Sequence, residues 1–372
     1  MRVVVAAAQP PFQEGGAAGR TTLALLRGLA ANGIEVHALA PVRPDEHASA
    51  PPDLDIDLVP VMLPERGGWR GAVDRVRRPV AELADTAFAE RLRAAAGTAD
   101  VVHLEQVETA CLGPTAAPTV LHLHYRSRLD APLGPPWRPA FRHRLEFAAA
   151  EHRAARRFDW LLCNSGDVAA SLSGLRTRAE ITVAPLPLDP ADYPVEAPVE
   201  EPVVGVIGTA SWSPTATAID RTLTKLWPAV HAQNPDARLR IAGRGTERFH
   251  SPDPSVAIAG TVPSAAEFVA GLAVMLYAAP RGSGTKVKVL EALACGVPVV
   301  TTAAGVEGIA GNAGTVVADS DADLTAACVR LLRDPAERAE RGQAGRRYIE
   351  ERHSPARATE AIAALYRRMA AG

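Results

Sequence analysis

The sequence is poor in cysteine and lacks any long apolar run. Its four cysteines lie far apart, with no Cys-x-x-Cys pair and no histidine at zinc-binding spacing, which argues against a disulfide scaffold or a structural zinc site. The longest apolar stretch, residues 269–279, is too short to cross a bilayer, and the run at residues 3–8 ends before an export signal could form. These absences predict a soluble, reduced, cytoplasmic protein.

The sequence also has no excess charge of either sign and very little lysine. Its 40 basic and 42 acidic residues give a formal net charge of −2, so the field of the whole chain gives no reason to expect a nucleic-acid partner. Only three of the basic residues are lysines, namely Lys225, Lys286 and Lys288. Because nearly every other basic position is arginine, two lysines within three residues indicate a place that requires a compact ammonium group.

Short buried strands alternate with helices along the first half of the chain. With 372 residues, 47% of them hydrophobic, the chain is long enough for two domains. Strands are predicted at residues 3–8 and 34–40, joined by a helix over 18–32 that Asn32-Gly33 ends. This β–α–β unit is the start of a doubly wound parallel sheet. Further strands are predicted at residues 101–104, 119–123 and 160–163.

A segment rich in proline and acid, residues 186–202, is interpreted as a linker, and beyond it the same alternation starts again. The predicted fold class is therefore α/β, with two doubly wound Rossmann-like domains. Strands are predicted at residues 203–207, 237–242, 256–258, 274–277 and 298–301, and helices at 217–233, at 285–295 and from 335 to the end.

The clearest signal of a site is a glycine loop, residues 282–284, that opens the predicted helix at Thr285. Thr285 can cap this helix, and the free N–H groups and positive dipole end there form an anion site suited to a diphosphate. Lys288 and Glu291 share one helix face. Glu291 is expected about 9 Å along the axis from Thr285, where its carboxylate can accept ribose hydroxyls. The alternative is an ordinary glycine turn before a helix with a solvated Lys–Glu pair.

This run and most of the chain around it resemble the retaining GT-B glycosyltransferases of glycosyltransferase family 4. The family signature has a glycine loop, a threonine, basic residues and a Leu-Glu-Ala helix that leads into Gly-x-Pro-Val-Val, as residues 282–300 do. The resemblance continues, in the family's order, at residues 102–106, 119–127, 159–167, 226–243 and 345–347.

The resemblance implies a GT-B fold, in which two Rossmann-like domains face a central cleft. By this resemblance, residues 1–190 bind the acceptor and residues 191–349 bind the nucleotide-sugar donor. A C-terminal helix within residues 350–372 is expected to cross back to the first domain. Glu291 would hold the ribose, and the loop amides with a basic residue would hold the diphosphate. The implied donor-binding residues are Gly208, Thr209, Arg244, Gly282, Ser283, Gly284, Thr285, Lys286, Lys288 and Glu291.

Many family members carry two glutamates eight residues apart, and the first of these positions is Ser283 here, so the sugar and the nucleotide base are not inferred. Arg244, between two glycines, can make bidentate contacts to phosphate, and a solvated loop position is an equal alternative.

In the N-terminal half, Gly15 and Gly16 follow the first strand, with Arg20 one turn into the next helix. Ligands bind at such places in doubly wound sheets, and the resemblance brings this loop close to the diphosphate and the acceptor. Gly16 is therefore a predicted catalytic residue, and Gly15 and Arg20 are predicted to bind the acceptor. A plain strand-to-helix turn is the alternative.

Two later strands of this half end in polar residues. His124 matches the family histidine near the transferred sugar and is predicted to be catalytic, whereas His122, on the same face of its strand, is interpreted as structural. Glu105 and Gln106 end the preceding strand, where they either orient the acceptor or cap a loop.

Residues 126–157 hold eight arginines, three acidic residues and interleaved aromatic residues that include Trp137. One interpretation is a basic amphipathic patch that makes weak peripheral contact with a membrane, for a lipid-linked acceptor. The alternative is a solvated helix face beside an anionic acceptor site.

The function implied by the resemblance is retaining transfer of a sugar from a nucleotide-diphosphate sugar to an acceptor hydroxyl, on a cell-envelope glycan, a glycolipid or a natural product. No metal or other cofactor is expected. The alternatives are a nucleotide-sugar hydrolase or epimerase of the same fold, and a non-catalytic glycosyltransferase-like partner subunit. A dinucleotide oxidoreductase is disfavoured because no Gly-x-Gly-x-x-Gly follows the first strand.

Overall fold

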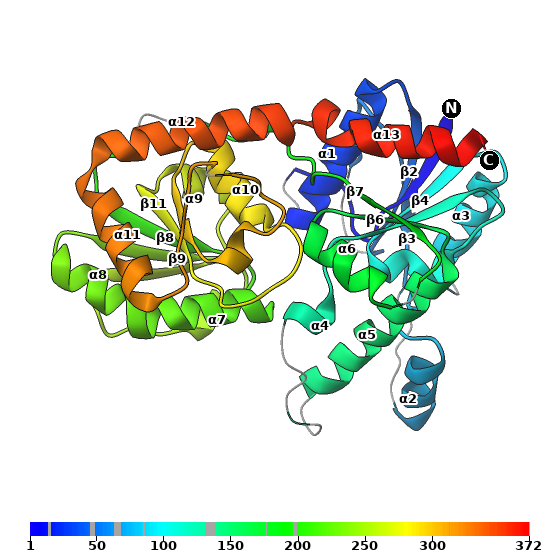
Figure 1. Ribbon diagram of the computed structural model, residues 1–372. Helices are drawn as coiled ribbons and strands as arrows, with labels where there is room; N and C mark the ends of the chain where they lie inside the picture. The colour runs from blue at the N-terminus through cyan, green and yellow to red at the C-terminus, as the bar shows by residue number, and fades with distance from the viewer. Residues whose placement is uncertain are drawn as a thin grey trace. The chain divides into compact units, whose positions relative to one another are not determined.

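A computed structural model of the chain describes residues 1–13, 16–44, 49–62, 68–84, 86–130, 135, 139–175, 177–195, 199–311 and 313–371. These residues form two compact units. Unit 1 comprises Met1–Pro187 and Ser354–Gly372, and unit 2 comprises Leu188–His353. Each unit is built on one parallel sheet with helices packed against it (Figure 1). The predicted α/β class with two Rossmann-like sheets is thereby confirmed.

The sheet of unit 1 has seven parallel strands in the order β3-β2-β1-β4-β5-β6-β7. The strand order reverses between β1 and β4, and ligands bind at the carboxyl ends of the strands at such a switch point. Residues 3–6 are fully buried because both faces of β1 are covered. The strands are β1 Arg2–Ala6, β2 Glu35–Val42, β3 Asp55–Pro60, β4 Val101–Glu105, β5 Thr119–Leu123, β6 Trp160–Cys163 and β7 Glu180–Val183.

The helices of unit 1 bury two separate apolar cores, one on each face of the sheet. One core gathers Val4, Leu104 and Phe88, and the other packs Val3 and Val5 against the first and last helices of the chain. The helices are α1 Ala17–Ala31, α2 Gly68–Arg77, α3 Ala87–Ala96, α4 Ser127–Asp130, α5 Pro139–Arg157, α6 Gly166–Ser173 and α13 Pro355–Ala371, with a 3₁₀ turn η1 at Val107–Leu112.

The C-terminal helix α13 packs directly on α1 within unit 1 (Figure 1). Ile362, Leu365, Tyr366 and Met369 form its buried face at helical spacing. A Cβ atom at Gly28 of α1 would lie 2.2 Å from the carbonyl oxygen of Pro355, so only glycine fits where the two segments meet. The apolar period of the last segment therefore identified the face that is buried.

The sheet of unit 2 has six parallel strands in the order β10-β9-β8-β11-β12-β13. Its strands are β8 Val203–Ile207, β9 Arg238–Ala242, β10 Val256–Gly260, β11 Val274–Tyr277, β12 Val299–Thr301 and β13 Thr315–Val317. Its helices are α7 Ser213–Arg221, α8 Trp227–Gln233, α9 Ala265–Ala270, α10 Val287–Ala294, α11 Asp321–Arg333 and α12 Pro335–Arg352. Short turns are η2 Pro190–Asp192, η4 Thr246–Arg248 and η5 Ala303–Val306.

Prolines interrupt two of the predicted helices. The helix expected over 217–233 is α7 and α8 joined by a π-helical stretch, η3 Thr222–Leu226, because Pro228 lacks the N–H that would continue the regular bonding. The helix expected from 335 onward is divided between α12 and α13, since Pro355 disfavours helical backbone at Ser354.

The first part of the segment interpreted as a linker, residues 186–193, has three side chains packed in the protein interior. Leu186, Leu188 and Tyr193 are each less than 5% exposed. The backbone N–H of Leu188 donates to the carbonyl of His353 at 2.7 Å. Tyr193, itself part of unit 2, contacts the predicted site residue Glu291.

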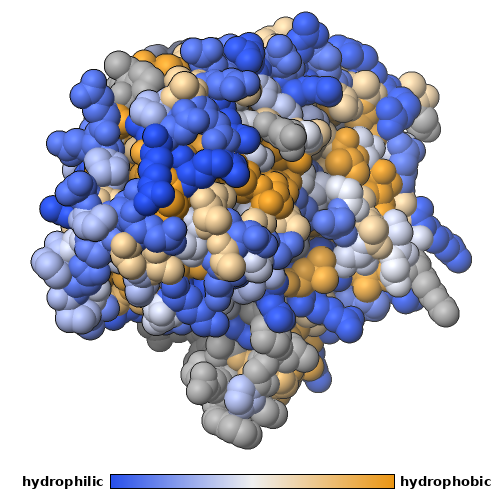
Figure 2. Space-filling model, turned by 60° about the vertical axis from the view of Figure 1, so that its left-hand side comes forward, coloured by the Kyte–Doolittle hydropathy of each residue, from blue (hydrophilic) through white to orange (hydrophobic). Residues whose placement is uncertain are grey.

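Among the described residues, no helix is both long enough and apolar enough to cross a membrane. The face drawn in Figure 2 is mainly hydrophilic, with separate apolar patches between the charged side chains.

Candidate functional site

The glycine loop between β11 and α10 differs from its prediction at the helix start. Helix α10 begins at Val287 with Lys286 as its N-cap, and no side chain caps it. Thr285 therefore neither starts nor caps the helix, contrary to the prediction. The left-handed backbone of Gly284, with φ of +70°, keeps the chain in loop conformation up to this point. Gly282, Ser283 and Thr285 stay in the same loop, and Ser283 and Thr285 are buried there.

Glu307 is a site residue that the sequence analysis missed. Its Oε1 accepts the backbone N–H of Gly284 at 2.8 Å, and its Oε2 lies 3.9 Å from the Nζ of Lys286. Lys286 also donates to the carbonyl of Gly284 at 2.5 Å, and both charged side chains are less than 10% exposed. One lysine of the pair is thus held inside the loop. The signal was available, since Glu307 follows β12, the strand beside β11, and parallel strands end at one edge of a sheet.

Lys288 contacts the carboxyl end of β8. Its Nζ donates to Thr215 Oγ1 at 3.1 Å and lies 4.7 Å from the centre of the Tyr277 ring. A Cβ atom at Gly208 would come within 2.7 Å of Lys288 Cε, so the lysine packs closely on the glycine that ends this strand. Burial lowers the pKa of Lys288 to about 8, against the opposing effect of Glu291. The structure therefore brings together two predicted donor residues from distant parts of the sequence.

Glu291 is 3% exposed and lies one turn after Lys288 on α10. Its Oε1 accepts the hydroxyl of Tyr193 at 3.1 Å. Arg346 of α12 in turn donates to the carbonyl oxygens of Tyr193 and Ala294, at 3.1 and 2.7 Å. A tyrosine from the predicted linker and an arginine from a distant helix thus fix the carboxylate, and no local pattern pointed to either.

The loops after β8 and β9 lie against each other. A Cβ atom at Gly243 would lie 2.2 Å from the carbonyl oxygen of Gly208, and the N–H of Ala210 donates to the carbonyl of Arg244 at 2.8 Å. The side chains of Thr209 and Arg244 are both exposed. The predicted donor residues Gly208, Thr209 and Arg244 are thus neighbours at one sheet edge.

In unit 1, Gly16 is the N-cap of α1 and Arg20 lies in the first turn of that helix. Gly15 lies outside the described residues. A Cβ atom at Gly19 would lie 2.6 Å from the carbonyl oxygen of Pro10, so the loop after β1 packs tightly on the start of α1. Gly19 was not singled out from the sequence.

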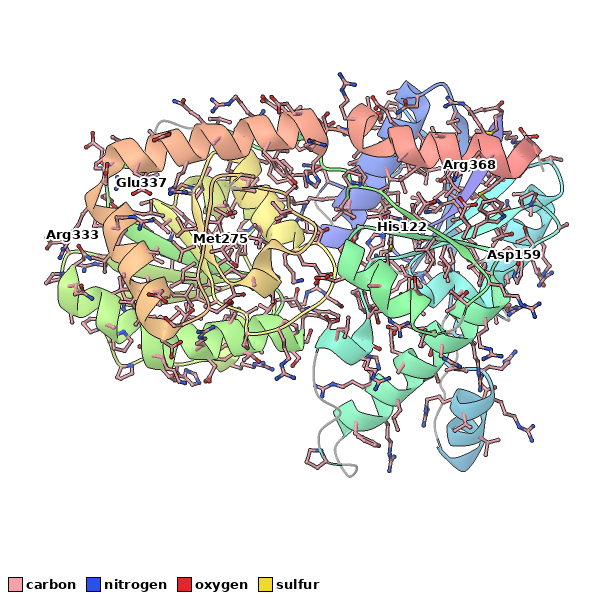
Figure 3. All side chains as sticks on the ribbon, viewed as in Figure 1. His122, Asp159, Met275, Arg333, Glu337 and Arg368 are labelled. Atoms are coloured by element: carbon pink, nitrogen blue, oxygen red, sulfur yellow. The ribbon has the colours of Figure 1, made fainter. Side chains whose placement is uncertain are left out.

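The side chain of Glu105 is enclosed at the end of β4 and makes contact with three histidines. His103 Nε2 and His122 Nδ1 each lie 2.8 Å from Glu105 Oε1, and His124 Nε2 lies 2.8 Å from Oε2. Glu105 is 1% exposed, and its carboxylate faces histidine rings and not solvent. His122 is buried among the strands of unit 1, as expected for a structural histidine (Figure 3).

Gln106, which follows Glu105, is 8% exposed and has a φ of +67°, a left-handed conformation that is rare outside glycine. Its N–H donates to the carbonyl of His122 at 2.9 Å, which joins the ends of β4 and β5. Backbone strain of this kind clusters at ligand sites.

Among the described residues, one group could bind a metal ion. Its ligand atoms, from His103, Glu105 and His122, lie within 4.8 Å of one another. Glu105 is held ionised there: burial opposes ionisation, but His122 and His124 outweigh it and hold the pKa of Glu105 well below its ordinary value. Burial lowers the pKa of His122 to about 4.

Some arginines of the arginine-rich region, residues 126–157, bond to other groups of the protein. Arg126 forms a buried ion pair with Glu151 at 3.3 Å, and Arg153 donates to the carbonyls of Val76 and Arg77 at 2.7 and 2.5 Å. Trp137 lies outside the described residues. The remaining basic face belongs to α5.

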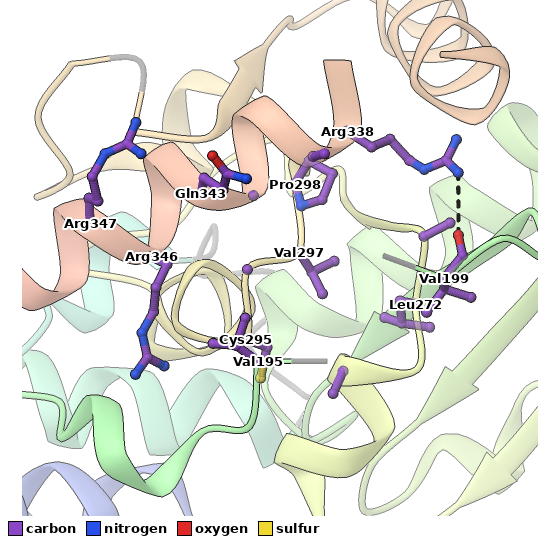
Figure 4. Close-up of a pocket in the computed structure, with 15 residues that line it drawn as sticks. Val195, Val199, Leu272, Cys295, Val297, Pro298, Arg338, Gln343, Arg346 and Arg347 are labelled. Atoms are coloured by element: carbon purple, nitrogen blue, oxygen red, sulfur yellow. Dashed lines mark hydrogen bonds between the residues drawn. The ribbon is translucent and has the colours of Figure 1, made fainter. Parts of the chain in front are cut away.

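A pocket of about 350 Å³ lies at the opposite end of α10 from Lys288 (Figure 4). It lies between Cys295, Val297 and the α12 residues Arg338, Gln343 and Arg346, and Arg338 donates to the carbonyl of Val199 at 3.3 Å. Its lining includes none of the predicted donor-binding residues.

Comparison with known families matches each half of the chain to a glycosyltransferase model. Residues 15–192 match the model described as Glycosyltransferase Family 4, and residues 201–334 match that described as Glycosyl transferases group 1. A curated relative from Corynebacterium glutamicum, a GDP-mannose-dependent monoacylated alpha-(1-6)-phosphatidylinositol monomannoside mannosyltransferase, is 37% identical over 150 residues. That match spans 35% of this chain and 38% of the relative's own length.

Solved structures resemble the chain over its whole length. Sucrose-phosphate synthase from Thermosynechococcus elongatus aligns with a TM-score of 0.72 and 16% identity, over 100% of this chain and 99% of that one. HepE from Anabaena, in complex with UDP-glucose, aligns with a TM-score of 0.65 and 14% identity, over 99% of this chain and 100% of that one. Similarity at this level of identity establishes a shared fold.

Proposed function

Since the chain belongs to the family-4 type of glycosyltransferases and has the GT-B fold, we propose that it is a sugar transferase. In this proposal it moves a sugar from a nucleotide-diphosphate sugar to an acceptor hydroxyl, with retention of configuration. Unit 2 binds the donor and unit 1 binds the acceptor. The observation that carries the proposal is the placement of Lys288 against Gly208, with Glu291 one turn further along the same helix.

This placement suits a nucleoside diphosphate. A cation beside a glycine that permits close backbone approach suits the phosphates, and a carboxylate one turn away suits a pair of ribose hydroxyls. Tyr193 donates to Oε1 of Glu291 and thereby helps to fix the orientation of the carboxylate. Since Lys286 is held by Glu307 and by the carbonyl of Gly284, we assign the larger phosphate role to Lys288.

The reaction proceeds without a metal in this proposal. The acceptor oxygen bonds to the anomeric carbon on the face from which the diphosphate departs, while the bond from that carbon to the diphosphate oxygen breaks. A departing diphosphate oxygen takes the hydroxyl proton, and the products are a glycoside and a nucleoside diphosphate. Lys288 and the N–H groups of the loop stabilise the negative charge that develops on the leaving group. His124 and Gly16 lie at the transferred sugar.

For the acceptor, the proposal includes a lipid-linked hydroxyl at the cytoplasmic membrane surface. The relative from Corynebacterium glutamicum is named for a phosphatidylinositol monomannoside, and α5 presents the exposed apolar Leu145 next to arginines. Weak contact through residues 126–157 would bring such a lipid to unit 1. Gly15, Arg20, Glu105 and Gln106 stay assigned to the acceptor side, Glu105 acting through the histidines.

Titration with UDP, GDP, dTDP and ADP, followed by protein-detected binding, tests the proposal. We expect one base to be preferred by about tenfold or more, because a specific base contact contributes on the order of 1–3 kcal/mol. Mass spectrometry of products from the matching nucleotide sugars then separates transfer from hydrolysis or epimerisation. Absence of binding by all four diphosphates would contradict the donor site and favour a non-catalytic subunit.

A further inference from the structure

Five side chains of unit 1 form a continuous buried polar chain at the ends of β4 and β5. Tyr366 of α13 contacts His103 Nδ1 through its hydroxyl at 2.5 Å, and the other ring nitrogen of His103 contacts Glu105. Glu105 then contacts His122 and His124. Exposure rises only at the last member, His124, whose side chain is 13% exposed against 2% or less for His103, Glu105 and His122.

The positions of the protons follow from Glu105. An ionised carboxylate only accepts hydrogen bonds, so the nitrogens that face it, His103 Nε2 and His122 Nδ1, carry N–H groups. His103 Nδ1 is then the bare nitrogen and accepts from Tyr366, a phenol whose pKa burial raises well above its ordinary value. His122 Nε2 is buried without a hydrogen-bond partner among the described residues, which suits a bare nitrogen better than an N–H.

His124 is the member of the chain that reaches the surface. Its Nε2 lies 2.8 Å from Glu105 Oε2 and 3.3 Å from His122 Nδ1. The carboxylate is the closer neighbour, and a negatively charged oxygen at 2.8 Å calls for a proton on His124 Nε2. Because His122 Nδ1 also carries a proton, the 3.3 Å contact between these two nitrogens is then not a hydrogen bond. Nδ1 is then the nitrogen of His124 that is left for a ligand.

We propose that Glu105 is a positioning residue that fixes the tautomers of three histidines and so presents His124 with Nδ1 available to the ligand, while Tyr366 of the C-terminal helix anchors the far end. The proposal rests on the proposed function, in which His124 lies at the transferred sugar. Nδ1 then accepts a hydrogen bond from a hydroxyl of the sugar or of the acceptor.

A metal ion bound by His103, Glu105 and His122 is the competing interpretation. Two ligand atoms that each lie about 2.0–2.1 Å from a tetrahedral zinc ion are about 3.3 Å apart. The carboxylate oxygen lies 2.8 Å from each of the two histidine nitrogens, which is hydrogen-bond length. The hydroxyl of Tyr366 also completes the bonding of His103 without a metal.

Long-range ¹H–¹⁵N NMR of the histidine rings in the ligand-free full chain tests the proposal directly. We expect Nε2–H for His103, Nδ1–H for His122 and Nε2–H for His124. An Nδ1–H tautomer at His124 or at His103, or an Nε2–H tautomer at His122, would overturn the proposal. So would one bound metal per chain whose removal by a chelator shifts these signals.

Glu105→Gln provides the second test. Glutamine keeps the shape but offers one acceptor oxygen and an NH₂ donor, so at least one of the three histidines must move its proton. We expect an altered tautomer and a kcat about 10- to 100-fold lower, with donor affinity unchanged because the predicted donor residues lie in unit 2. Unchanged tautomers together with unchanged kcat would contradict the positioning role.

Two further variants separate the possible failures. Glu180→Gln, which alters an exposed acid of unit 1 paired with Arg368 at 2.6 Å, should change neither readout. Tyr366→Phe should change the chemical shift of His103 Nδ1 and of no other histidine nitrogen. This variant tests the network of polar side chains if Glu105→Gln does not fold. If none of the nucleotides binds, the proposed function is wrong. The measured tautomers still test, independently, whether Glu105 fixes the histidines.

Discussion

The carboxylate of Glu307 accepts the backbone N–H of Gly284 at 2.8 Å, within the glycine loop that opens the donor helix. An N–H group that the sequence assigned to a diphosphate is therefore already bonded to a side chain of the protein. The same carboxylate faces the buried ammonium of Lys286. Glu307 thus organises the loop, and under the proposed function Lys288 and the other N–H groups of the loop bind the phosphates.

Glu307→Ala is expected to destabilise unit 2. Removing the carboxylate leaves the N–H of Gly284 and the ammonium of Lys286 with fewer partners, which costs about 2–4 kcal/mol for buried groups of this kind. Urea unfolding measures the loss, with Glu340→Ala, an exposed acid of α12, as the control. A variant of unchanged stability that binds the nucleoside diphosphate more tightly would instead make Glu307 a competitor of the phosphates.

The three lysines form a matched series for diphosphate binding. Lys288→Ala should weaken a nucleoside diphosphate by about 10- to 100-fold and leave the weak binding of the nucleoside unchanged, since only the diphosphate carries the charge. Lys286→Ala should have a smaller effect on affinity, and Lys225→Ala, which removes a lysine 64% exposed beside Asp321, should have none. Equal losses for nucleoside and diphosphate would indicate a folding defect.

The affinity for the diphosphate should depend on pH above about 8, the pKa of Lys288. The anion binds the protonated lysine, so above pH 8 binding must take up a proton and the affinity should fall, by at most about tenfold per pH unit. Isothermal titration in two buffers of different ionisation enthalpy measures the proton uptake. A fall of the same size in Lys288→Ala would assign the titration to another group.

Gly28→Ala is expected to displace α13 from α1. The added Cβ atom would lie 2.2 Å from the backbone carbonyl of Pro355, a contact that side-chain motion does not relieve, so we expect a loss of about 2–4 kcal/mol. Gly166→Ala, where nothing lies within 4 Å, is the matched control. Thermal unfolding by calorimetry measures the loss in both variants. A Gly28→Ala chain as stable as the control would contradict the described packing.

Much of the fold was predictable because its signals are local. The apolar runs of β1, β8 and β11, the left-handed Gly33 after α1 and the helical period around Tyr366 each lie within a few residues of one another. The helix start at Val287 was misjudged because the bond from Gly284 to Glu307, 23 residues away, competes with a cap at Thr285.

The contacts of the candidate site were less predictable than its residues. Glu291 and Lys288 could be named from spacing, but Tyr193 and Thr215 reach them across 98 and 73 residues of sequence. Glu105 could be named as polar and at a strand end, and His103 lies two residues away on the same strand. Its contacts with His122 and His124 instead depend on the register of β4 against β5. Such contacts are fixed by strand order, which a local pattern does not contain.

The central claim is that Glu291 holds the ribose of a nucleotide donor. Its most direct test is a thermodynamic cycle that compares wild type and Glu291→Ala in binding the preferred nucleoside diphosphate and its 2′,3′-dideoxy analogue. We predict that wild type binds the analogue about 10- to 100-fold more weakly, because the carboxylate loses two hydroxyl donors, and that Glu291→Ala binds both ligands equally. A variant that still discriminates between them as wild type does would contradict the account.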